Sequence, residues 1–110
     1  MIVDMKQKLL GIDLTALKDE AGKEVEVGLI VLRALGANLD TDRTMDGEQK
    51  VKIWELAVKI GSSDKPVDLT PEELVVLKQR VGAAFGPMIV GPAYRILNGT
   101  PPLRLTPATE

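Results

Sequence analysis

The stretch Leu69-Thr70-Pro71-Glu72-Glu73-Leu74 decides the fold of this chain, because local chemistry alone predicts that a helix starts there. Thr70 can cap the helix, Pro71 suits the first helical position, and Glu73 can complete a capping box with Thr70. Leu69 and Leu74, on either side of the cap, can form a hydrophobic staple. The apolar residues that follow at helical spacing predict a helix continuing to near Gly86. They are Leu74, Leu77, Val81 and Phe85.

A second amphipathic helix precedes this one, with Asp46 as a good N-cap. Its apolar residues form a stripe and a set that widens the stripe, namely Val51, Trp54 and Val58, then Ile53, Leu56, Ala57 and Ile60. Together they exceed the width that a surface helix needs. A lone tryptophan on such a stripe favours a place in the core for Trp54, with an anchor at a binding surface as the alternative. Glu48–Lys52 and Glu55–Lys59 are expected as ion pairs along the helix.

Residues 9–27 allow two interpretations. Apolar residues alternate with other residues on both sides of a turn at Gly22, which favours two short strands joined as a β-hairpin. They are Leu10, Ile12 and Leu14 before the turn, and Val25 and Val27 after it. The alternative is a helix over residues 14–21 that follows an Asp13 cap. The next apolar run, 28–35, ends at Gly36 and predicts a buried helix.

The last helix has two possible starts. Pro87 suits the first helical position, whereas Pro92 would either kink the helix or mark its beginning. Gly82 and Gly86 predict a close approach of the last two helices where they turn.

The fold class predicted from these elements is mainly α (α+β), with three or four helices packed with a short N-terminal β-hairpin. We expect one globular domain over residues 9–98. A flexible N-terminus is expected over residues 1–8 and a flexible, proline-containing tail over residues 99–110. In that tail, Leu103 and Leu105 could add to the sheet edge of a partner or dock in its groove.

Composition argues against catalysis. The 110 residues include no histidine and no cysteine. The chain therefore lacks the side chain that titrates near neutral pH and the usual thiolate nucleophile. Its two serines, Ser62 and Ser63, have no histidine to activate them. We expect neither an enzyme nor a cofactor, and no catalytic residue is identified.

The acidic residues between 40 and 48 invite a calcium interpretation, with Asp42 as first ligand and Gly47 at the tight turn. This alignment puts Ile53 where the bidentate glutamate belongs, so no metal site is expected. The other acids in the stretch are Asp40, Asp46 and Glu48. Glu72 and Glu73 could be read as paired acid–base carboxylates, but a helix cap explains them without further residues.

Charge and hydropathy limit the classes of partner that this chain can bind. The formal net charge is −2, with 14 basic and 16 acidic residues interleaved along the chain. Duplex DNA binding needs a basic face, so we do not expect nucleic acid as a partner. The longest nearly uncharged run, 81–94, is shorter than the ~20 residues that span a bilayer and is broken by glycine and proline. We expect no membrane association and a cytoplasmic location.

Several short motifs occur in a characteristic order over roughly residues 9–98. They are Asp13-Leu14-Thr15-x-Leu17-Lys18-Asp19-x-x-Gly22-Lys23, Asp46-Gly47-Glu48-x-Lys50, Leu56-Ala57-x-Lys59-Ile60, Val67-Asp68-Leu69-Thr70-x-Glu72-Glu73 and Phe85-Gly86-Pro87-x-x-Val90-Gly91. This order resembles a family of short proteins encoded by tailed bacteriophages and prophages. The family has no assigned catalytic activity, so the resemblance implies no site residue.

The resemblance implies a phage or prophage origin. The expected function is that of a non-enzymatic interaction protein, with an accessory role in virion head or tail assembly and another phage or host protein as its partner. The alternative is a small DNA-associated phage regulatory protein. The sequence indicates neither the oligomeric state nor the residues that bind the partner.

Overall fold

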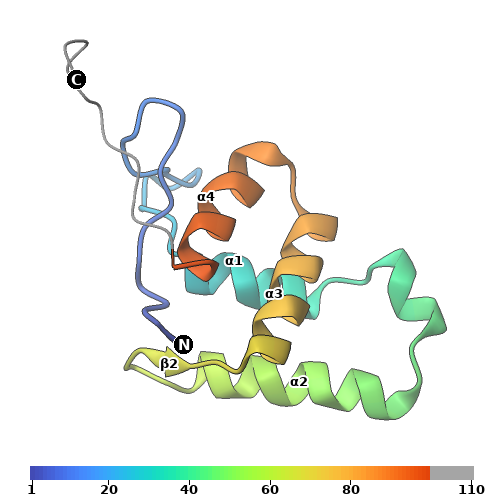
Figure 1. Ribbon diagram of the computed structural model, residues 1–110. Coiled ribbons are helices and arrows are strands. Elements are labelled where there is room, and N and C mark those ends of the chain that lie inside the picture. Colours follow the sequence, from blue (N-terminus) through green and yellow to red (C-terminus); the bar gives the residue numbers. More distant parts are fainter. Residues whose placement is uncertain (100–110) are drawn as a thin grey trace.

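The computed structural model describes residues 1–99, except for the side chain of Thr41. Within that part, four α-helices, one 3-10 helix and two short strands follow one another (Figure 1). They are β1 (Ile2–Val3), α1 (Val27–Gly36), η1 (Asp40–Thr44), α2 (Gly47–Gly61), β2 (Val67–Asp68), α3 (Pro71–Ala84) and α4 (Pro87–Leu97). The predicted mainly α fold is confirmed. Residues 100–110 of the expected tail, with Leu103 and Leu105, lie outside the described residues.

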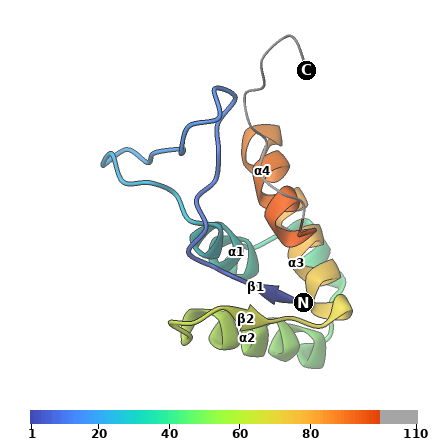
Figure 2. The same ribbon diagram turned by 60° about the vertical axis from the view of Figure 1, so that its left-hand side comes forward.

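Helix α1 is the centre of the core, because α2, α3 and α4 all pack against it (Figures 1 and 2). Its buried side chains are aliphatic, in keeping with a core that contains no buried aromatic ring. The buried helix predicted for residues 28–35 is confirmed. Its first turn is tight, because the amide of Gly28 donates to the carbonyl of Met5 at 2.9 Å and a Cβ on Gly28 would lie 2.8 Å from that oxygen.

The two-stranded sheet joins segments far apart in the chain. Ile2 pairs with Asp68 and Val3 with Val67, antiparallel, as Figure 2 shows beside α2. The side chains of Val3 and Met5 are buried in the core. Residues 1–8 are therefore part of the packed domain, in contrast to the flexible segment expected from their polar composition. A buried valine and methionine at alternate positions stabilise this edge against fraying.

The hairpin predicted over residues 9–27 does not form as two regular strands; the segment is a loop held by three isolated antiparallel bridges, Lys8–Glu26, Leu10–Ala16 and Lys18–Glu24. No strand and no helix forms between Val3 and Val27. Three backbone hydrogen bonds of 2.8–3.0 Å connect the parts of this loop. The amide of Leu17 donates to the carbonyl of Leu9, the amide of Leu9 donates to the carbonyl of Val25, and the amide of Val25 donates to the carbonyl of Leu17. Asp13 explains the difference, because its carboxylate accepts from the amide and the hydroxyl of Thr15 and makes an extra turn within the first expected strand. The expected turn at Gly22 is present, with a φ of +81°.

Helices α3 and α4 meet closely at Gly82. A Cβ on Gly82 would lie 2.6 Å from the hydroxyl oxygen of Tyr94, and that hydroxyl donates to the carbonyl of Lys78. The expected close approach is thus confirmed at Gly82, whereas Gly86 has open space around it. Helix α4 begins at Pro87 and continues through Pro92, which answers the question of its start. Each helix within residues 1–99 is too short or too polar to cross a bilayer.

The contact at Gly82 predicts a change of sign in a pair of variants. Gly82→Ala adds helix propensity but displaces the Tyr94 hydroxyl from Lys78, so we expect the free energy of unfolding to fall by about 1 kcal/mol. In a Tyr94→Phe background the obstacle is gone, and Gly82→Ala should raise stability by about 0.5–1 kcal/mol. Urea denaturation of the four proteins measures both effects. Equal effects of Gly82→Ala in the two backgrounds would contradict the contact.

Candidate functional site

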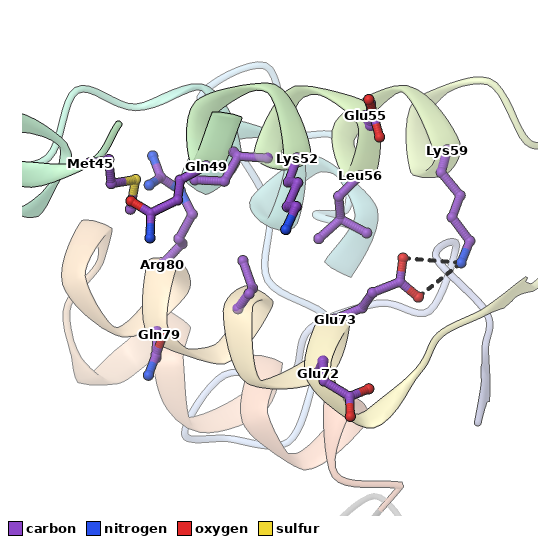
Figure 3. A pocket seen from close by; sticks show the side chains of 12 residues that line it. Met45, Gln49, Lys52, Glu55, Leu56, Lys59, Glu72, Glu73, Gln79 and Arg80 are labelled. Atoms are coloured by element: carbon purple, nitrogen blue, oxygen red, sulfur yellow. Dashed lines mark hydrogen bonds and ion pairs between the residues drawn. The ribbon is translucent and has the colours of Figure 1, made fainter. Parts of the chain in front are cut away.

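A groove between α2 and α3 is lined by many charged side chains (Figure 3). Its volume is about 610 Å³, within the range of ligand-binding pockets. Lys52 and Leu56 of α2 point toward α3 in Figure 3. The lining residues are Met45, Gln49, Lys52, Ile53, Glu55, Leu56, Lys59, Glu72, Glu73, Val76, Gln79 and Arg80.

Local capping chemistry positions both walls. Asp46 accepts from the amide of Gln49 at 2.8 Å, and the Gln49 side chain accepts from the amide of Asp46 at 3.1 Å. Thr70 and Glu73 form the same reciprocal pair at the start of α3, at 3.1 and 2.8 Å. Both predicted caps are confirmed. The two walls therefore begin at residues whose side chains leave little freedom in where each helix starts.

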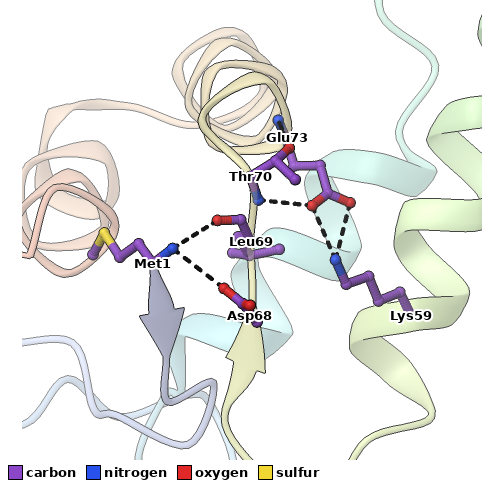
Figure 4. Close-up of polar contacts among 6 residues, drawn as sticks. All are labelled: Met1, Lys59, Asp68, Leu69, Thr70 and Glu73. Carbon is purple, nitrogen blue, oxygen red and sulfur yellow. Dashed lines mark hydrogen bonds and ion pairs between the residues drawn. The ribbon is translucent and has the colours of Figure 1, made fainter.

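One end of the groove is closed by an ion pair that crosses it. The ammonium of Lys59 donates to both carboxylate oxygens of Glu73, at 2.9 and 3.2 Å (Figure 4). Glu73 thus caps α3 and holds α2 with the same carboxylate. The ion pair expected between Glu55 and Lys59 does not form, because Lys59 reaches across to α3 instead. Glu48 and Lys52 do not pair either in the described part of the chain.

The surroundings of Glu73 act on its pKa in opposite directions. Partial burial raises the pKa, whereas the amide of Thr70 and the ammonium of Lys59 lower it and outweigh the burial. Glu73 is therefore ionised at neutral pH. An ionised carboxylate that caps α3 and binds Lys59 of α2 has a structural role. This argues against the interpretation of Glu72 and Glu73 as paired acid–base carboxylates.

The other end of the groove is closed by Arg80, which is 5% exposed. Its guanidinium donates to the Asp42 carboxylate at 2.7 and 3.2 Å. It also donates to three backbone carbonyls near the C-terminus of α1, those of Ala34, Leu35 and Ala37, at 2.8–3.3 Å. Carbonyls at a helix end lack the amide partner of the next turn, and of these three only that of Ala34 accepts from a backbone amide of the described residues, that of Ala37 at 3.4 Å. One side chain of α3 therefore binds both the C-terminal end of α1 and the 3-10 helix η1, which precedes α2.

Asp42 is the acid that the calcium interpretation placed first. The hydrogen bond from Arg80 and that from the Leu39 amide, the latter at 2.9 Å, lower its pKa to about 2. Asp46, a second acid of the stretch, is engaged by Gln49. Among residues 1–99, no three acidic side chains gather where they could hold a metal ion. The stretch from 40 to 48 acts as a joint between helices.

The middle of the groove is open and combines an apolar floor with charges that make no ion pair in the described residues, namely the ammonium of Lys52 and the carboxylates of Glu55 and Glu72. Ile53 and Val76 are half-buried, and Leu56 is 6% exposed. Above them Lys52 is exposed and makes no ion pair within the described residues. An apolar strip beside an unpaired ammonium can bind a segment that has an apolar side chain and a carboxylate.

The far side of α2 carries a second apolar surface. Val51, Trp54 and Val58 are 51%, 66% and 46% exposed; we call these three residues the outer face. The expectation of a core position for Trp54 is therefore wrong. Only the other apolar set, including Leu56 and Ile60, faces the core. The apolar stripe of α2 is wider than a surface helix needs because the helix has two apolar faces. One face is covered by the core and the other is exposed.

The serines have structural partners. The hydroxyl of Ser62 donates to the carbonyl of Val58 at 2.6 Å, and that of Ser63 to the carbonyl of Lys65 at 2.9 Å. Sequence reasoning did not single out Arg80, and it assigned Lys52 and Lys59 only to ion pairs along their own helix. An arginine at the i+3 position from Leu77 on an otherwise apolar helix face is the one sequence signal that could have indicated a buried charge.

The low pKa of Asp42 predicts how stability changes in acid. A depressed pKa gives a contribution that is complete above the unfolded value of about 3.9 and is lost as the pH falls toward about 2. We expect Asp42→Asn to lower the urea midpoint strongly at pH 7, and the gap to the parent protein to narrow below about pH 4. Asp40→Asn, an exposed change in the same 3-10 helix, is the control. A gap of constant size down to about pH 2 would contradict the ion pair.

Comparisons with protein-family models, with curated proteins and with solved structures found no match to this chain.

Proposed function

We propose that this chain is a non-enzymatic interaction protein that binds a segment of another protein in the groove between α2 and α3. The observation that carries the proposal is that an apolar surface and an unpaired ammonium lie together in the open middle of that groove. An apolar floor of Ile53, Leu56 and Val76 lies beside the unpaired ammonium of Lys52. The fitting segment has one or two apolar side chains and a carboxylate that reaches Lys52.

The ends of the groove support this proposal because they keep it open without a partner. Lys59 and Glu73 tie α2 to α3 at one end, and Arg80 ties α3 to Asp42 at the other. A groove that is held in shape before binding loses less conformational freedom when a partner arrives. The same ion pairs occupy Glu73 and Asp42, two of the acids that the sequence suggested for catalysis or metal binding.

The wider setting follows the resemblance in motif order. A tailed-phage or prophage origin, a cytoplasmic location and an accessory role in assembly of the virion head or tail belong to this proposal. The partner is then another phage protein or a host protein. A single free ammonium above an apolar floor suits a protein segment better than the phosphates of duplex DNA, which need a basic face.

Site-specific photo-cross-linking in host cells tests this function. A photoreactive residue replaces exposed Gln79 in the groove, and a second protein carries it at Val75, an exposed position on α3 outside the groove lining. We expect one adduct of defined mass from position 79 and none from position 75.

Lys52→Glu should reduce that adduct about tenfold, because it places a carboxylate against the partner's carboxylate. Lys23→Glu, the same change in the loop that turns at Gly22, is the matched control. Adducts that are equal from both positions, or unaffected by Lys52→Glu, would refute binding in the groove.

A further inference from the structure

The outer face of α2 has the spacing of a coiled-coil seam. Val51, Trp54 and Val58 follow one another by three and four residues, which is the a, d, a order of a heptad. Lys50 then occupies the g position and Glu55 the e position, on the two flanks of the seam. Neither of these two residues takes part in an ion pair within the described residues. The face thus has an apolar centre and flanks of opposite charge.

Nothing else in the described fold covers this face. Helix α2 runs along the lower edge of the molecule in both ribbon views, with the other helices above it (Figures 1 and 2). Figure 3 shows Glu55 on the side of α2 that is turned away from α3. A second helix could therefore lie along α2 without displacing any described element.

We propose that the outer face pairs with the same face of a second copy of this chain, the two α2 helices running parallel. The charges on the flanks select this occupant and this direction. In a parallel pair, the g position of one helix lies beside the e position five residues later on the other. Lys50 of each copy therefore meets Glu55 of its partner, so the pair contains two complementary contacts.

The antiparallel arrangement is disfavoured by the same charges. There e positions face e positions, so Glu55 lies beside Glu48 of the other copy and two acids oppose each other. Lys50 then faces Ala57 and gains no partner. Complementary flanks in one direction and like charges in the other make the parallel pair the specific one.

This dimer does not depend on the proposed function, since Val51, Trp54 and Val58 lie outside the lining of the groove and only Glu55, on the flank of the seam, borders it. It leaves both grooves open, and it holds them at a fixed separation. Two linked grooves can bind two segments of an assembling partner with greater avidity than one. The seam is short, so we expect a reversible dimer that forms with increasing concentration.

The absence of native cysteine allows a direct test of direction. Val51→Cys and Val58→Cys each place one thiol on the seam, and Val75→Cys places one on an equally exposed helix position elsewhere. In a parallel pair each seam cysteine meets its own counterpart. Mild oxidation with diamide should therefore give a disulfide-linked dimer with either seam variant and little with Val75→Cys. No more cross-linking with either seam variant than with Val75→Cys would overturn the parallel pair.

Sedimentation equilibrium from about 5 μM to about 1 mM tests the charges. We expect Glu55→Lys to raise the dimer dissociation constant about tenfold, and Lys50→Glu combined with Glu55→Lys to restore it. Trp54→Glu should give a monomer throughout, whereas Val75→Glu should leave the dimer intact. A parent protein that stays monomeric over the whole range, or a tighter dimer with Glu55→Lys, would refute the pairing. Neither result would affect cross-linking in the groove.

Discussion

The hydrogen bonds of Arg80 are the constraint on which the arrangement of helices depends. Its guanidinium is buried yet meets a carboxylate and three backbone carbonyls. Removing the carboxylate would leave the buried guanidinium of Arg80 without a charged partner, which is destabilising. The end of α1, the 3-10 helix η1 and the middle of α3 are therefore held at one point.

Two ion pairs determine the position of α2, that of Arg80 with Asp42 and that of Lys59 with Glu73. Helix α2 starts just after η1, whose Asp42 is bound by Arg80, and near its other end Lys59 is bound by Glu73 of α3. Between these two ties, α2 and α3 leave a groove with an apolar floor. The inner side of α2 packs on α1, so the outer face is left exposed. Both open surfaces are consequences of how α2 is held.

Local chemistry explains what could be predicted from the sequence. Thr70 and Glu73, like Asp46 and Gln49, are three residues apart, so the start of each helix could be read from neighbouring residues. The contacts that could not be read join distant residues. Arg80 and Asp42 are 38 residues apart, and the amino group of Met1 donates to the carbonyl of Leu69, which is 68 residues away (Figure 4).

The exposure of Trp54 shows a second limit of sequence reasoning. The apolar pattern of α2 reveals that two faces are apolar, but it does not say which of them another helix covers. That choice is made by the ties at the ends of α2, which are long-range. The candidate groove was missed for the same reason, because its walls come from two helices and its ends from two ion pairs.

Amide hydrogen exchange of Arg80→Met tests the central role of this guanidinium most directly. The control is Arg33→Met, the same change at an exposed position of α1. We expect Arg80→Met to accelerate exchange most at the Leu39, Asp42 and Met45 amides, which bond within and around η1, and at the first turn of α2. Exchange at these amides that is as slow in Arg80→Met as in Arg33→Met would contradict the account.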